Sequence, residues 1–212
     1  MGDNMSRTEE KELNITRVIK VAQELFLKNG IANTSVNTIA REAGLAPMSV
    51  YRYFGTKDEL VNRTWQDALV TFYEVFMERY AKRAEGLKTG YEKYNACMDV
   101  YFELYIEFPE WYKYTLEMFA SASDKRISET NDMKKVFWDY CGSEIPIPAL
   151  RAMKEGQLDG SIKPEINIME VYQVMLNAYT APSIFQDGTD GIRPVDIVSF
   201  TSRLIANFIK AE

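Results

Sequence analysis

Histidine is absent from the 212-residue sequence, and cysteine occurs only twice, as Cys97 and Cys141. Without histidine the chain lacks the usual general base, and with it Ser-His catalytic pairs and most zinc or haem sites. The two cysteines lie far apart and match no metal-binding or redox spacing, which favours two buried thiols. We therefore predict that the protein is not an enzyme and uses no metal or cofactor.

Long apolar runs are also missing. No stretch approaches the roughly 18 apolar residues of a membrane span, and the first residues, MGDNMSRTEEKELN, have no apolar core of a secretory signal. These absences predict a cytoplasmic protein without a membrane partner. The apolar residues (46%) and charged residues (26%) occur in the proportions of an ordinary globular protein, so the chain can bury a core.

Basic residues are fewer than acidic ones, 25 against 31, so the net charge is −6. The charged residues are also unevenly distributed along the chain. Residues 1–63 contain nine Lys or Arg against eight Asp or Glu, whereas the rest of the chain contains 16 against 23. A purely electrostatic nucleic-acid binder would carry a net positive charge. Any contact with nucleic acid is therefore expected in the near-neutral N-terminal part.

Helical spacing begins early in the chain. Ile15, Val18, Ile19, Ala22, Leu25 and Phe26 fall on one face of a helix. Ser6 and Glu9 have the spacing of a capping box at its start, and Asn29-Gly30 is a suitable end. A second, short helix follows, capped by Thr34 or Ser35 and ended by Gly44, with Val36, Ile39, Ala40 and Ala43 on its inner face.

A third helix is predicted from Pro47, which suits a first turn because its missing N–H costs nothing there. If Val50 points inward, Phe54 lies about 40° away and also points inward. Met48 and Arg52 then lie about 160° from Val50 and point outward. A two-turn helix with this polar and aromatic outer face has little reason to exist for packing alone.

Two short helices joined by a turn containing glycine indicate a helix-turn-helix, whose second helix enters the major groove of DNA. Arg52 can then reach a base edge or phosphate, Tyr51, Tyr53 and Lys57 can bind phosphate, and Met48 can meet a thymine methyl group. Ser35 and Asn37 lie at a helix N-terminus suited to a phosphate. Periodicity alone leaves a plain three-helix subdomain as the alternative.

The segment TSVNTIAREAGLAPMSVYRYFGTKDEL, residues 34–60, resembles the DNA-binding region of the TetR family of bacterial transcriptional regulators. The resemblance covers about fifty residues and includes Val50-Tyr51-Arg52-Tyr53-Phe54 followed by Lys57 and Leu60. It implies DNA contacts at Ser35, Asn37, Ala46, Pro47, Met48, Ser49, Tyr51, Arg52, Tyr53 and Lys57. Ala46 stands where Ser or Thr usually caps the recognition helix, and Pro47-Met48 where Lys-Gly is frequent, so Arg52 and the residues of the second helix should carry more of the specificity.

The rest of the chain is predicted to be helical. Helices are expected from Leu60 towards Ala84, and over about 91–108, 110–122 and 124–141. A short helix should end at Lys154, before a turn-rich connection over 155–167, and a final pair should cover 168–185 and 194–210. The fold class is thus all-α, with about nine or ten helices. We place a helix-turn-helix domain at 8–57 and an effector-binding and dimerisation domain at 58–212.

The last helix carries two apolar stripes about 100° apart. One contains Ile197, Leu204 and Phe208, and the other contains Val198, Ile205 and Ile209. One stripe can pack against the chain itself, and a second copy can cover the other in a four-helix interface. Central burial of both helices is the alternative. The resemblance favours a homodimer through the last two helices on a palindromic operator.

Aromatic residues are concentrated in residues 91–140, which contain 13 of the 27 in the chain. Aromatic residues in such a segment can simply form core, or they can line a pocket for a small apolar or aromatic effector, which the resemblance implies. The candidate ligand-binding residues are Tyr94, Met98, Tyr101, Tyr105, Trp111, Met118 and Trp138. The sequence thus predicts a regulator, in particular a repressor released by an effector. A helical interaction module without DNA binding and a helical enzyme are the alternatives.

Overall fold

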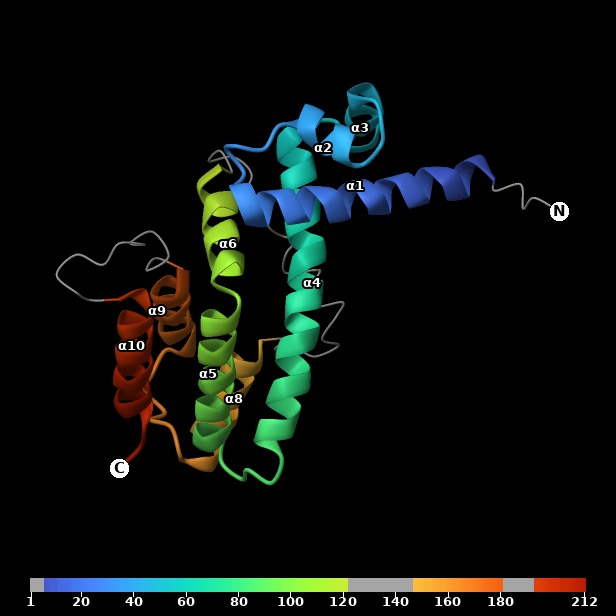
Figure 1. Ribbon diagram of the computed structural model, residues 1–212. Helices are drawn as coiled ribbons and strands as arrows, with labels where there is room; N and C mark the ends of the chain where they lie inside the picture. Colours follow the sequence, from blue (N-terminus) through green and yellow to red (C-terminus); the bar gives the residue numbers. More distant parts are fainter. Residues whose placement is uncertain (1–5, 122–146, 181–192) are drawn as a thin grey trace. The chain divides into compact units, whose positions relative to one another are not determined.

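The computed structural model describes residues 6–121, 147–180 and 193–212 (Figure 1). Within these ranges it contains nine helices, and its one β-type pairing is an isolated bridge between Ile162 and Lys210. The helices are α1 (Arg7–Asn29), α2 (Val36–Glu42), α3 (Pro47–Phe54), α4 (Lys57–Ala84), α5 (Gly90–Glu107), α6 (Pro109–Ser121), α8 (Pro148–Asp159), α9 (Ile168–Thr180) and α10 (Pro194–Ile209). The predicted all-α class is confirmed. The helix expected over 124–141 lies outside the described residues.

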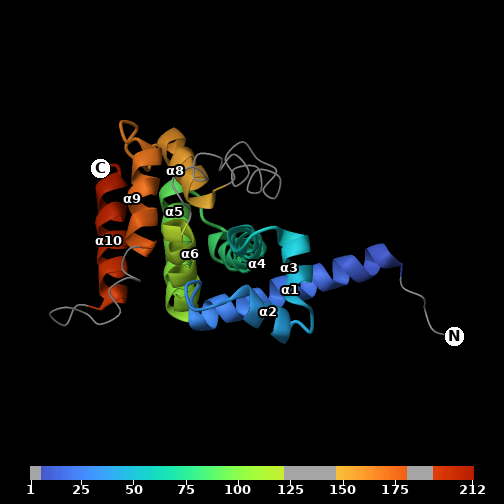
Figure 2. The same ribbon diagram turned by 90° about the horizontal axis from the view of Figure 1, so that it is seen from above.

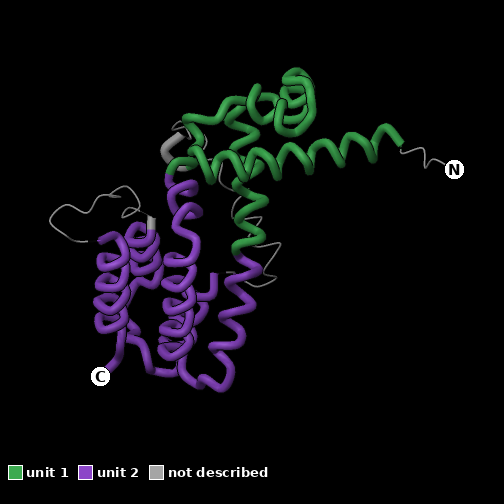
Figure 3. The backbone as a smooth tube through the Cα atoms, in the orientation of Figure 1, with its two compact units in different colours: residues 1–72, 117–123 green, residues 73–116, 124–212 purple. Residues whose placement is uncertain are grey.

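Contacts divide the chain into two compact units, coloured separately in Figure 3. Unit 1 contains residues 1–72 and 117–123, and unit 2 contains residues 73–116 and 124–212. The helices α4 and α6 each contribute residues to both units. The boundary expected between residues 57 and 58 remains a prediction.

In unit 1, the N-terminus of α1 is closed by the predicted capping box. The Ser6 hydroxyl accepts from the Glu9 N–H at 3.2 Å, and the Glu9 carboxylate accepts from the Ser6 N–H at 2.7 Å. The helix ends at Gly30, whose φ of 80° is one that L side chains rarely adopt. Val18, Ala22 and Phe26 are fully buried, so the predicted inner face of α1 is its core face.

Unit 2 is built around the pairing of α5 with α8, which is its most extensive helix contact. Gly90 starts α5 directly against Gly156 of α8, and a Cβ atom on Gly90 would overlap the Gly156 nitrogen and the Ala152 carbonyl oxygen. The helix α8 runs to Asp159, so the predicted end at Lys154 is wrong. Gly156, expected in a turn, is instead a helical position where a bare backbone allows the close approach to α5.

The last two helices, α9 and α10, pack on each other in unit 2 and lie side by side in both views (Figures 1 and 2). Val198, Ile205 and Ile209 are buried, as expected of one of the two stripes on α10. The other stripe is open, because Leu204 and Phe208 are 54% and 59% exposed. None of the helices in the described ranges is both long and apolar enough to cross a membrane.

Candidate nucleic-acid interface

The helix α2 begins at Ser35, which settles the choice between the two predicted caps. Its hydroxyl oxygen accepts from the Thr38 N–H at 3.0 Å, whereas Thr34 is buried and donates to the Gly30 carbonyl at 2.8 Å. Val36, Ile39 and Ala40 face the core. Asn37 is exposed, and its side chain has no hydrogen-bond partner among the described residues, so it is available to a ligand.

The helix α3 presents the predicted outer face. Val50 is 1% exposed, whereas Met48 is 73% exposed and Arg52 is also exposed. The Arg52 guanidinium donates to the Ser49 hydroxyl at 3.3 Å and lies 5.3 Å from the centroid of the Tyr53 ring. These weak, exposed contacts hold a cation beside an aromatic ring without burying it. The side chain can therefore turn to an external acceptor at small cost.

The N-terminus of α3 carries no side-chain cap. Ala46 is the N-cap residue and forms no side-chain hydrogen bond, and Pro47 occupies the first turn. Both are exposed, Tyr51 is 44% exposed, and Tyr53 is half-buried. The structure thus gathers the predicted positions Ala46–Ser49 and Tyr51–Tyr53 on one short helix. The wide exposure of Met48 and Arg52 leaves this face free of packing within unit 1.

Lys57, at the start of α4, is held by the backbone of unit 1. It is half-buried, and its ammonium group donates to the Ile31 carbonyl oxygen at 2.7 Å. An ammonium group has three donors, so this bond leaves two for another acceptor such as a phosphate. The N–H of Ile31 donates in turn to Glu117 at 2.7 Å. Glu117 was not predicted from the sequence, because no local pattern signals a contact across 86 positions.

The candidate ligand-binding residues are mostly buried in the structure. Tyr94, Met98, Tyr105 and Trp111 are at most 8% exposed, Tyr101 is half-buried, and all five belong to unit 2. Met118 is buried and belongs to unit 1, and Trp138 lies outside the described residues. Their contribution to a pocket remains a prediction.

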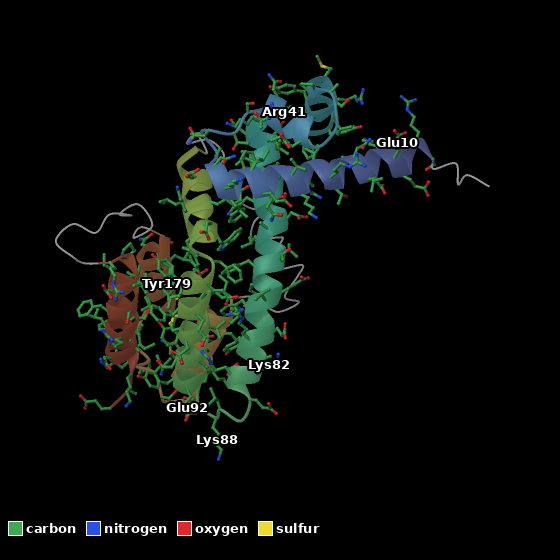
Figure 4. The ribbon with its side chains drawn as sticks, in the orientation of Figure 1. Glu10, Arg41, Lys82, Lys88, Glu92 and Tyr179 are labelled. Carbon is green, nitrogen blue, oxygen red and sulfur yellow. The ribbon has the colours of Figure 1, made fainter. Side chains whose placement is uncertain are left out.

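One aromatic ring that was not predicted from the sequence joins several of these residues. The Tyr179 ring, labelled in Figure 4, lies 6.0 Å from Tyr101, 5.9 Å from Tyr105 and 6.3 Å from Tyr112 between centroids. Its hydroxyl bonds with Ser202 at 3.1 Å. Its role here depends on tertiary packing, which periodicity does not report.

Two further buried groups lie near this aromatic cluster. The Tyr94 hydroxyl is buried and has no hydrogen-bond partner among the described residues. Cys97 is fully buried, and burial raises the pKa of its thiol well above the usual value. No group of acidic and cysteine side chains within the described ranges is arranged to hold a metal ion.

Comparison with known proteins points to one family. Residues 18–64 match the model of the bacterial regulatory proteins, tetR family. An HTH-type transcriptional regulator of Staphylococcus aureus strain MRSA252 is 25% identical over 135 residues, which cover 63% of this chain and 68% of that protein. One from strain USA300 is 28% identical over 101 residues, or 48% of this chain, and the match spans about half (52%) of that relative's length.

Solved structures share the fold. The transcriptional regulator FadR of Bacillus subtilis, in complex with stearoyl-CoA, superposes with a TM-score of 0.66 at 18% identity, covering 92% of this chain and 98% of that one. FadR of Bacillus halodurans gives 0.62 at 15% identity, covering 92% and 99%. At these identities the similarity shows the arrangement of helices alone.

Proposed function

We propose that this chain is a homodimeric repressor of the TetR family of bacterial regulatory proteins, whose model it matches over residues 18–64. It binds a palindromic operator and leaves it when a small effector binds. The observation that carries the proposal is the outer face of α3. There the exposed Met48 and Arg52 lie opposite the buried Val50 on a helix held by α2.

The proposed DNA contacts differ in whether they reach a base or a phosphate. Arg52 reads a base edge through its fork of N–H donors, and Met48 meets a thymine methyl group. Ser35, Asn37, Tyr51, Tyr53 and Lys57 bond phosphates and set the register. Ala46, Pro47 and Ser49 lie in the N-terminal turn of α3, which approaches the DNA closely. Arg41, labelled in Figure 4, is exposed and forms an ion pair with its exposed neighbour Glu42.

The homodimer is proposed to form through α9 and α10. Phe200, Leu204 and Phe208 recur every four residues on the exposed face of α10, and each is more than half exposed. Met169 and Val174 of α9 are also more than half exposed. Large apolar side chains gathered in this way favour association, and a two-fold axis makes the same surface its own partner.

The effector is proposed to bind among the aromatic residues of unit 2. Tyrosine faces suit an apolar or aromatic molecule, and the buried Tyr94 hydroxyl offers an unused hydrogen bond that such a molecule could satisfy. The Bacillus subtilis FadR structure, which contains stearoyl-CoA, supports this use of the fold. Release of DNA follows if the effector prefers a conformation that binds operator weakly. The proposed role is exercised on DNA in the cytoplasm and requires no catalytic step.

The test is selection of bound DNA from a random pool. The purified protein should enrich one sequence with two inverted half-sites about one helical turn apart, because each protomer presents one α3. Met48→Glu is the matched negative variant, because this exposed side chain can be changed without disturbing the core. It should remove the enrichment and leave the thermal melting temperature unchanged.

Other outcomes separate the alternatives. Retention that is equal for all sequences and falls steeply with salt would mean a non-specific binder. No retention at low salt would favour an interaction module and overturn the proposal. Once a site is known, a panel of amphipathic molecules that includes long-chain acyl-CoA can be screened for release of the labelled DNA.

A further inference from the structure

The helices α4 and α6, which contribute residues to both units, each bond to the same residue of the DNA-binding region, Ile31, through a charged side chain. The helix α4 starts in unit 1 with Lys57, and α6 ends in unit 1, where residues 117–123 group with residues 1–72. The Lys57 ammonium group donates to the Ile31 carbonyl oxygen at 2.7 Å. The Ile31 N–H donates to the Glu117 carboxylate, also at 2.7 Å. One buried residue is therefore held on both sides by charged groups from two long helices.

These bonds belong to the stronger class of hydrogen bonds. Each pairs a neutral backbone group with an ionised side chain, which shortens the bond and roughly doubles its strength. Ile31 is 6% exposed, so its backbone groups cannot easily exchange these partners for water. Loss of the Glu117 carboxylate would leave a poorly hydrated N–H, and the loop after α1 would then rearrange to satisfy it.

The loop is shaped to receive this carboxylate. Gly30, next to Ile31, has a φ of +80°, and a Cβ atom there would lie 3.0 and 3.2 Å from the two Glu117 oxygens. The Gly30 carbonyl accepts from the Thr34 hydroxyl at 2.8 Å, and Ser35, the cap of α2, follows directly. The position of the Glu117 side chain is thus linked through five consecutive residues to the N-terminus of α2.

We propose that Glu117 is a positioning residue for DNA binding, which fixes the loop of residues 30–34 and with it α2 and the Lys57 ammonium group. This inference rests on the proposed function, because it assigns to Glu117 a part in DNA binding. When the bond is absent, the loop spends only a fraction of its time in the binding-competent form, and the apparent affinity falls by that fraction.

Three substitutions separate the contact from the charge. Glu117→Ala removes both, Glu117→Gln keeps an oxygen acceptor of the same reach and loses the charge, and Glu117→Asp keeps the charge on a side chain one methylene shorter. Glu110, exposed on the same helix, supplies the matched controls Glu110→Ala and Glu110→Gln. Affinity is measured by fluorescence anisotropy with the operator selected by the unchanged protein. Circular dichroism confirms that each variant is folded at the assay temperature.

We expect Glu117→Ala and Glu117→Asp to bind about tenfold more weakly, which corresponds to about 1.4 kcal/mol, and Glu117→Gln to bind within about threefold of the unchanged protein. Both Glu110 variants should bind at least as tightly as the unchanged protein, because each removes a negative charge. Hydrogen exchange of the Ile31 amide in the DNA-free protein should be faster in Glu117→Asp than in Glu117→Gln. This readout reports the bond even if Glu117→Ala does not fold.

Two results would overturn the inference in distinguishable ways. Equal affinities for Glu117→Asp, Glu117→Gln and the unchanged protein would refute the positioning role and leave the proposed function intact. Failure of the unchanged protein to bind any DNA would refute both.

Discussion

Gly90 and Gly156 meet backbone to backbone, at the point where α5 begins against α8. The N–H of Gly90 donates to the Asp159 carboxylate at 2.7 Å, and the N–H of Tyr91 donates to the Ser161 hydroxyl at 3.1 Å. The first N–H groups of α5 are therefore satisfied by residues at the end of α8. This pairing builds the part of unit 2 on which α9 and α10 pack.

Gly90→Ala should destabilise the protein by about 3 kcal/mol or more, because the new methyl group meets backbone atoms that cannot move aside. Gly86→Ala is the comparison, since its Cβ atom would meet nothing within 4 Å and the cost is confined to its φ of +78°. We expect that cost to be about 1 kcal/mol. Urea denaturation measures both, and equal losses would show that the helices can separate without penalty.

Arg52→Ala should weaken operator binding by about 1–3 kcal/mol, or roughly 5- to 150-fold, and relax the preference at one base pair. Arg52→Lys keeps the charge without the planar fork, so it should retain salt-dependent binding and lose the base preference. Lys82→Ala is the control, because Lys82 is exposed in unit 2 and paired with Glu78 on the same helix. An unchanged base preference in Arg52→Ala would remove this residue from the readout.

Leu204→Glu should dissociate the dimer, raising its dissociation constant about 100-fold if the side chain lies at the centre of the interface. Leu158→Glu makes the same change on α8 at a leucine that is 79% exposed, and should leave the dimer intact. Sedimentation velocity at micromolar concentration distinguishes the two species. If both variants remain dimeric, the interface does not use this face of α10.

Stability should fall as the pH rises above about 10. Burial raises the pKa of Tyr80 from 10.0 to about 12, and it raises the pKa values of Tyr94, Tyr101, Tyr105, Tyr112, Tyr172 and Tyr179 as well. Between pH 10 and 12 the unfolded chain ionises these groups while the folded protein does not, so alkaline pH favours unfolding. Below pH 10 the tyrosine hydroxyls keep their protons in both the folded and the unfolded state. The stability that comes from burying these neutral hydroxyls is then fully present.

This expectation is tested by measuring urea denaturation midpoints at several pH values. The tyrosinate absorbance of the folded protein, followed over the same pH values, reports tyrosine ionisation. Tyr80→Phe should reduce the alkaline loss, because a phenyl ring has no proton to release. Titration of every tyrosine near pH 10 in the folded protein would contradict the expectation.

The DNA-binding region could be predicted closely from sequence. Ser6 caps α1, Gly30 ends it, and Val50 faces inward, as local spacing indicates, whereas the choice of Ser35 over Thr34 as the cap of α2 came from the structure. These features depend on residues three or four positions apart, which share a helix face whatever the rest of the chain does. The two stripes on α10 followed from the same rule, but which one is buried did not. Packing against the rest of unit 2 decides that Val198 is buried and Leu204 is exposed.

The sequence by itself determined most of the helices, the capping box of α1 and the outward face of α3, because each is set by interactions within a few residues. Only the tertiary structure placed Gly156 within a helix, brought Tyr179 to the rings of α5, and joined Glu117 to Ile31. Those contacts link residues that are tens of positions apart in the chain. They exist because whole helices pack together, and hydrophobic spacing specifies that a face is buried without specifying its partner.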